Sequence, residues 1–332
     1  MSSAAAPIPT GRLLLIYGCI LLGVCGHASS EFVAVLTGMF GPELTVWRFM
    51  IGGAGLVLLA LFWPGQQDLL TPLKVEGAKI AVLSIFGMTL AQLLFHWALN
   101  FATAIQVATM VSTMPLLVVL ANWIINRGPI STAKWVSGIG ALFGVVILLT
   151  DGYLVQLTVA GEWSKAFVGV LLAFGCALVS SVYMVLVRPL YQRWGAVRMT
   201  AYCFAIGFFA LWPTVGLVWG IWVDPTTLFD RTPQQWSAVL TLGVWNTTIA
   251  MALWLGGLAA APDIGRANYL FFLKPVIAAA LALAFLDQPF TVTQLLAVLV
   301  VCGCVLVELF WDQISGLFGR RPLPVAAERP RR

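Results

Sequence analysis

The longest uncharged stretch of the chain runs from Ile80 to Asn126 and contains no Asp, Glu, Lys or Arg. An apolar segment of about 20 residues is enough to cross a bilayer as a helix. As one helix, this stretch would reach about 70 Å at a rise of about 1.5 Å per residue. It therefore has to fold back on itself, and we expect the reversal at Asn100–Thr103.

Composition extends this constraint to the whole chain. Of its 332 residues, 61% are hydrophobic and 9% are charged, and the mean hydropathy is +0.96. A soluble domain has about a quarter charged residues, so this chain has too few to cover a water-exposed globule. The net charge of +5 comes from loops and a tail, a distribution that favours membrane topology over nucleic-acid binding.

The fold class predicted is an all-α polytopic membrane protein with ten transmembrane helices. Residues 1–11 are expected to be a disordered N-terminal segment and 313–332 a basic cytoplasmic tail. Leu13–Cys25 resembles a signal peptide, but the apolar segment continues to Leu36, so we expect no cleavage. The expected spans are 12–36, 43–63, 77–99, 103–126, 133–150, 166–188, 198–222, 236–259, 264–286 and 291–311.

Basic residues predict the orientation. With both termini in the cytoplasm, the outer loops contain only Lys165 and Arg231, and Arg48 and Lys274 lie inside helices. All other Lys and Arg residues are then on the inner side, which matches the positive-inside rule. The expected location is the bacterial inner (plasma) membrane, with the lipid bilayer as partner.

Two prolines recur at one separation, which indicates an internal repeat. Pro115 and Pro275 are 160 residues apart, and so are Pro129 and Pro289. With 17 prolines in the chain, chance is the alternative explanation. The repeats would be 12–150 and 166–312, joined by an outer linker at 151–165. Five helices in each half would make the second half insert upside-down, as in many secondary transporters.

The chain resembles the drug/metabolite transporter superfamily in its ten-helix form with two EamA-type repeats. The resemblance covers about residues 13–309 and implies a secondary transporter that works by alternating access. The residues that carry it are Val46-Trp47-Arg48-Phe49-Met50, then Ala98-Leu99 with Ala104, Ala108 and Met114-Pro115-Leu116, and then Leu273-Lys274-Pro275-Val276-Ile277 with Leu286-Asp287-Gln288-Pro289.

Two positions depart from the family pattern. Many members have Glu where this chain has Lys274, and the acidic residue common after the fourth helix is replaced around Asn126-Arg127. With Lys274, the chain is more similar to aromatic amino acid exporters of the YddG type. This narrower resemblance implies a small-molecule substrate, an amino acid or a similar metabolite.

Lys274 is the first candidate site residue. It would lie about 15 Å deep, near the midplane, next to the helix-breaking Pro275. Glu31 is the one acidic residue expected inside a helix, but it would lie near the outer face, too far to pair with Lys274. Lys274 is then either a binding group for a substrate carboxylate or a neutral lysine bonded to a carbonyl that the proline frees.

Other polar and aromatic residues in the helices are candidates for the same site. Glu31 and Arg48 are expected to form a hairpin salt bridge, with a gate as the alternative. Gln92 and His96 share a helix face and either line a cavity or join helices. Trp245, Asn246, Tyr183 and Tyr269 are the remaining substrate-binding candidates, with packing as the alternative for each.

The sequence shows no catalytic motif, no metal-ligand spacing and no ATP-binding motif. We therefore expect no enzyme activity, no cofactor and no metal, and no ATP-binding domain in this chain. The prediction is a secondary exporter of small amphipathic metabolites, most of all aromatic amino acids. The alternatives are efflux of cationic drugs or other metabolites, or a membrane-embedded enzyme or sensor. Both facilitated diffusion and proton antiport through His96, Glu31 or Lys274 remain open.

The predicted topology is testable with fusion reporters. Reporters placed after Arg127, Arg193 and Arg321 should report the cytoplasm, and reporters near Glu162 or Asp230 should report the outside. The asymmetry of basic residues is the physical reason. A cytoplasmic signal at Glu162 would contradict the arrangement of ten helices with both termini inside.

Overall fold

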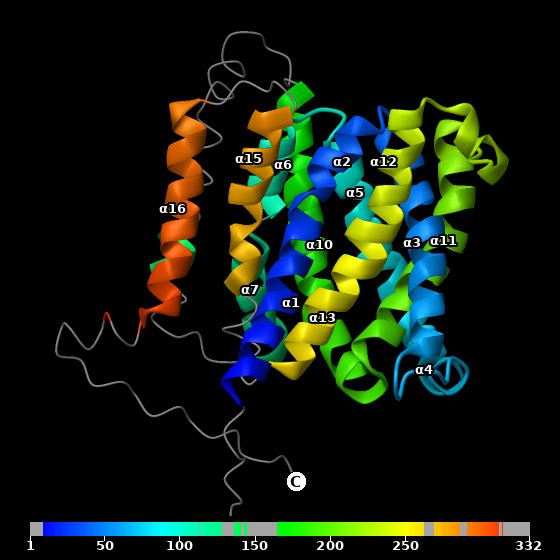
Figure 1. The fold of residues 1–332 in the computed structure, drawn as a ribbon, viewed down its shortest axis with the longest axis horizontal. Coiled ribbons are helices and arrows are strands. Elements are labelled where there is room, and N and C mark those ends of the chain that lie inside the picture. The colour runs from blue at the N-terminus through cyan, green and yellow to red at the C-terminus, as the bar shows by residue number, and fades with distance from the viewer. Residues whose placement is uncertain are drawn as a thin grey trace, which may run out of the picture.

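The protein is described by a computed structural model, which covers residues 9–111, 113–127, 136–140, 143–144, 165–261, 269–285, 291–311 and 314. Within these residues every regular element is a helix (Figure 1). Six helical segments are long and apolar enough to cross a membrane: Thr10–Leu36, Gly41–Phe62, Thr71–Ala98, Lys165–Trp194, Ala196–Trp219 and Pro233–Leu258. The protein is therefore built from membrane-spanning helices, as its composition predicts.

The first part of the chain forms α-helices with one π-helical turn. Its elements are α1 (Thr10–Ala28), α2 (Ser30–Leu36), α3 (Gly41–Phe62), α4 (Thr71–Leu83), the π turn η1 (Ser84–Thr89), α5 (Leu90–Ala98), α6 (Ala104–Val111) and α7 (Met114–Asn126). The reversal expected at Asn100–Thr103 lies between α5 and α6, as predicted. Most of the expected helix 133–150 lies outside the described residues.

The second part also consists of α-helices with one π turn, and it contains two 3₁₀ turns. Its elements are α10 (Lys165–Trp194), α11 (Ala196–Trp219), the 3₁₀ turn η2 (Pro225–Asp230), α12 (Pro233–Gly243), the π turn η3 (Val244–Ile249), α13 (Ala250–Ala260), the 3₁₀ turn η4 (Tyr269–Leu273), α15 (Lys274–Phe285) and α16 (Val292–Leu309). Nearly all of the expected linker 151–165, and of the tail 313–332, lies outside the described residues.

Two pairs of helices, each with one member in either part of the chain, run in opposite directions. In Figure 1, α1 runs upward and α10 downward, while α3 runs downward and α11 upward. The two π turns begin 160 residues apart, at Ser84 and Val244, which is the separation of Pro115 and Pro275. Each π turn packs on a helix of the other part: η1 of the first part packs on α11, and η3 of the second part packs on α3.

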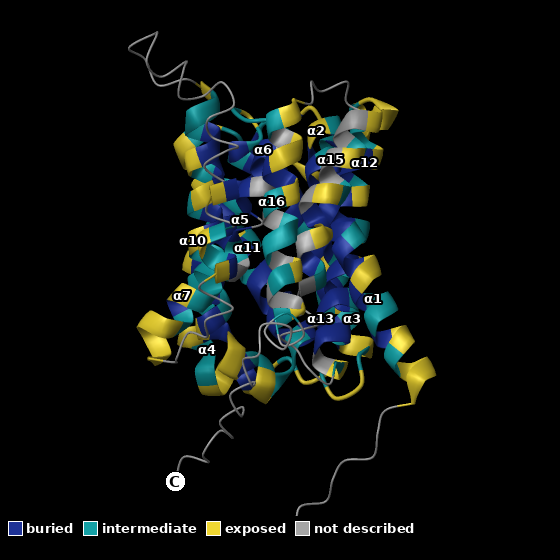
Figure 2. Cartoon of the chain, turned by 90° about the vertical axis from the view of Figure 1, so that its left-hand side faces the viewer, coloured by how far each residue is buried: buried dark blue, intermediate teal, exposed yellow. Residues whose placement is uncertain are grey.

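The interior is centred on the contact between α3 and α11. The rings of Phe49 and Phe204 stack there with their centroids 4.4 Å apart. Glycines let the backbones approach: a Cβ atom on Gly207 would lie 2.5 Å from the Phe49 ring, and one on Gly53 would lie 3.3 Å from Phe204. Small residues serve this purpose between membrane helices. Figure 2 shows the buried residues concentrated inside the bundle and the exposed ones at its periphery and ends.

Replacing Gly52 by alanine should destabilise the contact between α3 and η3. A Cβ atom there would lie 2.5 Å from Cγ2 of Thr247 on η3, and overpacking of this kind costs about 1–3 kcal/mol. The matched control is Gly18→Ala on α1, where nothing lies within 4 Å of an added Cβ. We expect Gly52→Ala, and not Gly18→Ala, to lower the melting temperature of the detergent-solubilised protein. Equal melting temperatures would contradict this packing.

Candidate functional site

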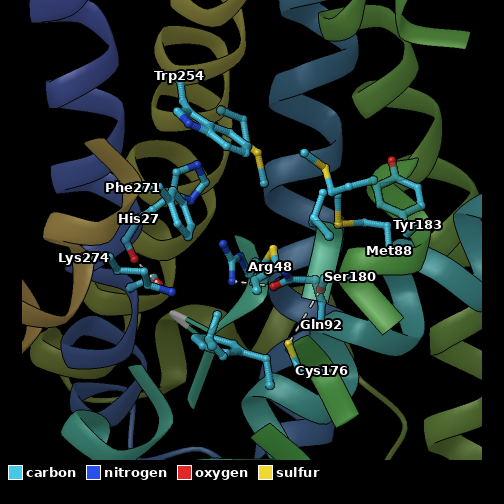
Figure 3. Close-up of a pocket in the computed structure, with 17 residues that line it drawn as sticks. His27, Arg48, Met88, Gln92, Cys176, Ser180, Tyr183, Trp254, Phe271 and Lys274 are labelled. Carbon is cyan, nitrogen blue, oxygen red and sulfur yellow. Dashed lines mark hydrogen bonds between the residues drawn. The ribbon is translucent and has the colours of Figure 1, made fainter. Parts of the chain in front are cut away.

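A cavity of about 120 Å³ lies inside the bundle, lined by residues of α1, α2, α3, η1, α5, α6, α7, α10, α13, η4 and α15. By the same measure a single water needs only about 10–15 Å³, so a small organic molecule is a possible occupant. Figure 3 shows its labelled side chains in two groups, with Arg48 between them. Its lining consists of His27, Ser30, Arg48, Met88, Gln92, Phe95, Val111, Met114, Val118, Cys176, Ser180, Tyr183, Met184, Met251, Trp254, Phe271 and Lys274.

One side of the cavity is an aromatic wall, formed by His27, Trp254 and Phe271. The ring of His27 lies edge-on to Trp254 at 5.2 Å, and Trp254 lies 5.3 Å from Phe271. Nε2 of His27 is buried and has no hydrogen-bond partner among the described residues. This wall therefore offers apolar ring surface with one unpaired polar atom.

Arg48 brings a guanidinium into the cavity from α3. Its Nε donates to Oγ1 of Thr247 at 2.8 Å, and its Nη1 donates to Oε1 of Gln92 at 2.8 Å. A third contact joins Nη1 to Nε2 of His96 at 3.3 Å. The π turn η3 orients Thr247, whose hydroxyl donates to the carbonyl of Leu242 five residues earlier. Each of these partners is an uncharged acceptor, so none of them balances the charge of Arg48.

Hydrogen bonds behind Arg48 define the state of His96. Because Nε2 of His96 accepts from Arg48, its Nδ1 carries the hydrogen and donates to Oγ1 of Thr45 at 3.1 Å. Thr45 in turn donates to the carbonyl of Gly41 at 2.8 Å. His96 is thus a neutral imidazole that joins α3 to α5. It does not line the cavity, whereas Gln92 on the same helix does.

Lys274 lines the cavity and forms an ion pair with Glu31. Its Nζ lies 2.6 Å from Oε1 of Glu31, and the side chains are 5% and 0% exposed. Nζ also lies 5.3 Å from the ring centre of Phe95 and 5.7 Å from that of Phe271. The prediction that Glu31 is out of reach is therefore wrong. It compared positions along each helix and neglected the length of two extended side chains.

The expected salt bridge between Glu31 and Arg48 is corrected by the same contacts. Glu31 pairs with Lys274, and its second oxygen accepts a hydrogen bond from Ser30 at 3.1 Å. Arg48 is bonded to neutral groups instead. Spacing from the nearest turn gave similar depths for Glu31 and Arg48, but it carried no information about which helix faces meet.

Both predicted helix breaks lie at junctions between elements next to the cavity. Pro115 is the second residue of α7, and α6 ends at Val111 just before it. Pro275 is the second residue of α15, directly after the 3₁₀ turn η4. At the first junction, the carbonyl of Met114 accepts a hydrogen bond from Ser181 on α10 at 3.0 Å. A neighbouring helix thus satisfies a carbonyl at the interruption.

The other candidate residues have different positions relative to the cavity: one lines it, one supports a helix bend next to it, and one lies outside its lining. Tyr183 lines the cavity with its ring, while its hydroxyl bonds to Tyr191 at 3.0 Å and to Cys203 at 3.1 Å. Asn246 donates to the carbonyl of Gly26 and to Ser29, so it supports the bend between α1 and α2. Trp245 is half-buried outside the lining.

Tyr269 begins η4, and its side chain is outside the described part. Sequence reasoning missed His27, Trp254 and Phe271, because nothing in one sequence distinguishes these aromatics from packing residues.

In the described part of the chain, no three His, Cys, Asp or Glu side chains are grouped to hold a metal ion.

The sequence pattern of the EamA-like transporter family matches the chain twice, at residues 9–150 and 167–309. The chain belongs to the EamA-like transporter family. The two matches together cover most of its length and fall on the two parts described above. Membership indicates a multi-pass membrane transporter rather than an enzyme.

Several relatives support this placement. An uncharacterized transporter of Archaeoglobus fulgidus is 26% identical over 265 residues, which are 80% of this chain and 86% of the relative. The uncharacterized transporter YetK of Bacillus subtilis is 22% identical over 270 residues, which are 79% and 76% of the two chains. A solved crystal structure at 22% identity has a TM-score of 0.64 and covers 93% of this chain and 99% of its own, which shows the shared fold.

The ion pair should govern the stability of the transporter. Either Glu31→Gln or Lys274→Met leaves one buried charge without its partner, a change that costs about 3–5 kcal/mol. The double variant Glu31→Gln/Lys274→Met leaves neither charge, so it should be more stable than either single variant. Equilibrium unfolding in mixed detergent micelles measures all three. A double variant whose loss equals the sum of the single losses would contradict the pairing.

Proposed function

We propose that this EamA-like protein is a secondary transporter that exports small amphipathic metabolites carrying a carboxylate, aromatic amino acids among them. The observation that carries the proposal is Arg48, a buried guanidinium in the cavity whose hydrogen bonds within the described part of the chain all go to neutral acceptors. A permanent cation so placed is completed by an anionic ligand, because guanidinium binds carboxylate in a two-pronged geometry.

The rest of the cavity supports an amphipathic ligand. His27, Trp254 and Phe271 provide ring surface on one side, and Met88 provides flexible apolar surface on the other (Figure 3). Met184 is a further methionine in the lining. Methionine adapts its shape to varied apolar groups. A few polar groups in a mostly apolar pocket are typical of small-molecule sites. The direction of transport and the class of aromatic amino acids rest on the sequence resemblance.

Alternating access between two inverted five-helix halves is part of the proposal. It is supported by the opposite directions of corresponding helices, by the matching positions of η1 and η3, and by their exchanged contacts with α11 and α3 (Figure 1). Such halves place a binding site near the midplane between them. The helix junctions at Pro115 and Pro275 lie beside this site and provide places where the halves bend.

α2, α6 and α15 pack against one another at the upper end in Figure 1, and we propose that they close the cavity at that end. With both termini in the cytoplasm, this end is the outer one, and the proposed state accepts substrate from the inside. We propose the bacterial inner membrane as its location, in line with the basic residues of the inner loops.

The alternatives agree less well with the cavity. Arg48 and the ion pair together leave a net positive charge, which repels a cationic drug. An embedded enzyme needs a nucleophile activated by a free base. Ser30, the described lining hydroxyl that contacts a carboxylate, contacts Glu31, and Glu31 is already paired with Lys274. Facilitated diffusion and proton antiport both remain compatible with this cavity.

Transport of phenylalanine tests the proposal. Liposomes containing the purified protein should move labelled phenylalanine faster than protein-free liposomes. Arg48→Met should lower the rate by about tenfold or more, because a charged hydrogen bond contributes about 1.5–3 kcal/mol. Arg48→Lys should restore only part of the rate, since an ammonium lacks the planar fork.

The matched control is Arg193→Met, because that side chain is 56% exposed at the end of α10, away from the cavity. It should transport at the wild-type rate. If Arg48→Met also transports at that rate, the guanidinium has no part in substrate binding.

A further inference from the structure

We infer that the cavity selects amphipathic carboxylates by net charge, and binds aryl monoanions that lack an ammonium group more tightly than zwitterionic amino acids. The inference rests on the proposed function and narrows its substrate class. Its basis is the sum of the charges on the side chains around the cavity, because a ligand binds best when it leaves no buried charge without a partner.

Glu31 and Lys274 contribute no net charge. Their side chains are 2.6 Å apart and almost completely buried. With Lys274 as an ammonium and Glu31 as a carboxylate, the charges of the pair sum to zero. An approaching carboxylate that displaced Glu31 from Lys274 would leave a buried carboxylate alone, and such a group is strongly destabilising. The pair is therefore a poor binding site for an anion.

Arg48 contributes one positive charge that its neighbours leave unbalanced. Thr247, Gln92 and His96 accept its hydrogen bonds and are neutral. The other described titratable side chains that line the cavity are His27, Cys176 and Tyr183, and each is uncharged near pH 7.5 at its ordinary pKa. The described groups around the cavity thus sum to one positive charge.

One carboxylate on the ligand balances the positive charge of Arg48, whereas an ammonium on the ligand finds no free carboxylate among the described residues. A monoanion with an aromatic tail places its carboxylate at Arg48 and its ring against Trp254 and Phe271. The ammonium of an amino acid would need a carboxylate, and Glu31 is the one carboxylate in contact with a cavity cation among the described residues. Because Glu31 is already held by Lys274, the ammonium is buried with weak partners, which lowers affinity.

Isosteric ligands test the inference directly. Calorimetry on the detergent-solubilised full chain, at a pH of about 7.5 where each ligand has its expected charge, should compare 3-phenylpropionate, phenylalanine and phenethylamine. We expect 3-phenylpropionate to bind about tenfold or more tightly than phenylalanine, and phenethylamine to bind most weakly. Phenylalanine binding as tightly as 3-phenylpropionate, or more tightly, would overturn the inference and leave the proposed transport of amphipathic carboxylates standing.

Two variants separate net charge from other causes. Lys274→Met releases Glu31 to receive an ammonium, so the preference for 3-phenylpropionate over phenylalanine should fall about tenfold. Glu31→Gln/Lys274→Met removes both charges and keeps the cavity at one positive charge, so its preference should stay within about threefold of wild type. A double variant that loses the preference would overturn the inference, even where Lys274→Met does not fold.

The failure of the proposed function has a different outcome. In that case, neither 3-phenylpropionate nor phenylalanine would bind to the wild-type protein, and neither would move across liposomes containing it.

Discussion

The burial of three charged side chains inside an apolar bundle is the constraint on which this structure depends. An ion in a low-dielectric interior is stable only with partners, and a charge in a bilayer faces protein or a wet cavity. Glu31 and Lys274 meet this requirement by pairing, and Arg48 meets it through Thr247, Gln92 and His96. Because these partners come from separate helices, α2, α3, α5, α15 and the π turn η3 have to approach one another around a single point.

Irregular backbone next to these charges has a consistent role. The bend at Ser29, the π turns η1 and η3, the junction before Pro115 and the 3₁₀ turn before Lys274 all lie in helices that form the cavity. Irregular backbone at membrane depth is tolerated where protein or a cavity satisfies its polar groups. Ser181 and Asn246 provide such support, since each donates to a carbonyl near an interruption. The breaks and their supporting side chains thus form one arrangement around the cavity.

Much of the fold was predictable, because the bilayer fixes the length and composition of its helices. The fold-back between α5 and α6 follows from the length of one uncharged stretch, and Lys274 was expected to lie in the interior because of its depth. The partner of Lys274 was not predictable, since helix spacing gives depth along one helix and says nothing about rotation or side-chain reach. His27 and Trp254 were missed because an aromatic residue that lines a cavity has the same sequence pattern as one that packs. The π turns were missed because hydrophobic periodicity over a few residues does not distinguish them from α-helix.

The π turns fix the angular register of the helices that contain them. A π turn holds one residue more than an α-helical turn, and one residue corresponds to about 100° of rotation about the helix axis. The part of this helical segment after η1, which is α5, is therefore rotated by about that angle around the helix axis, relative to a helix without the extra residue. Gln92 and His96 lie directly after η1 and both contact Arg48, and Thr247 lies within η3. One inserted residue in each of two helices thus directs three side chains toward the same guanidinium.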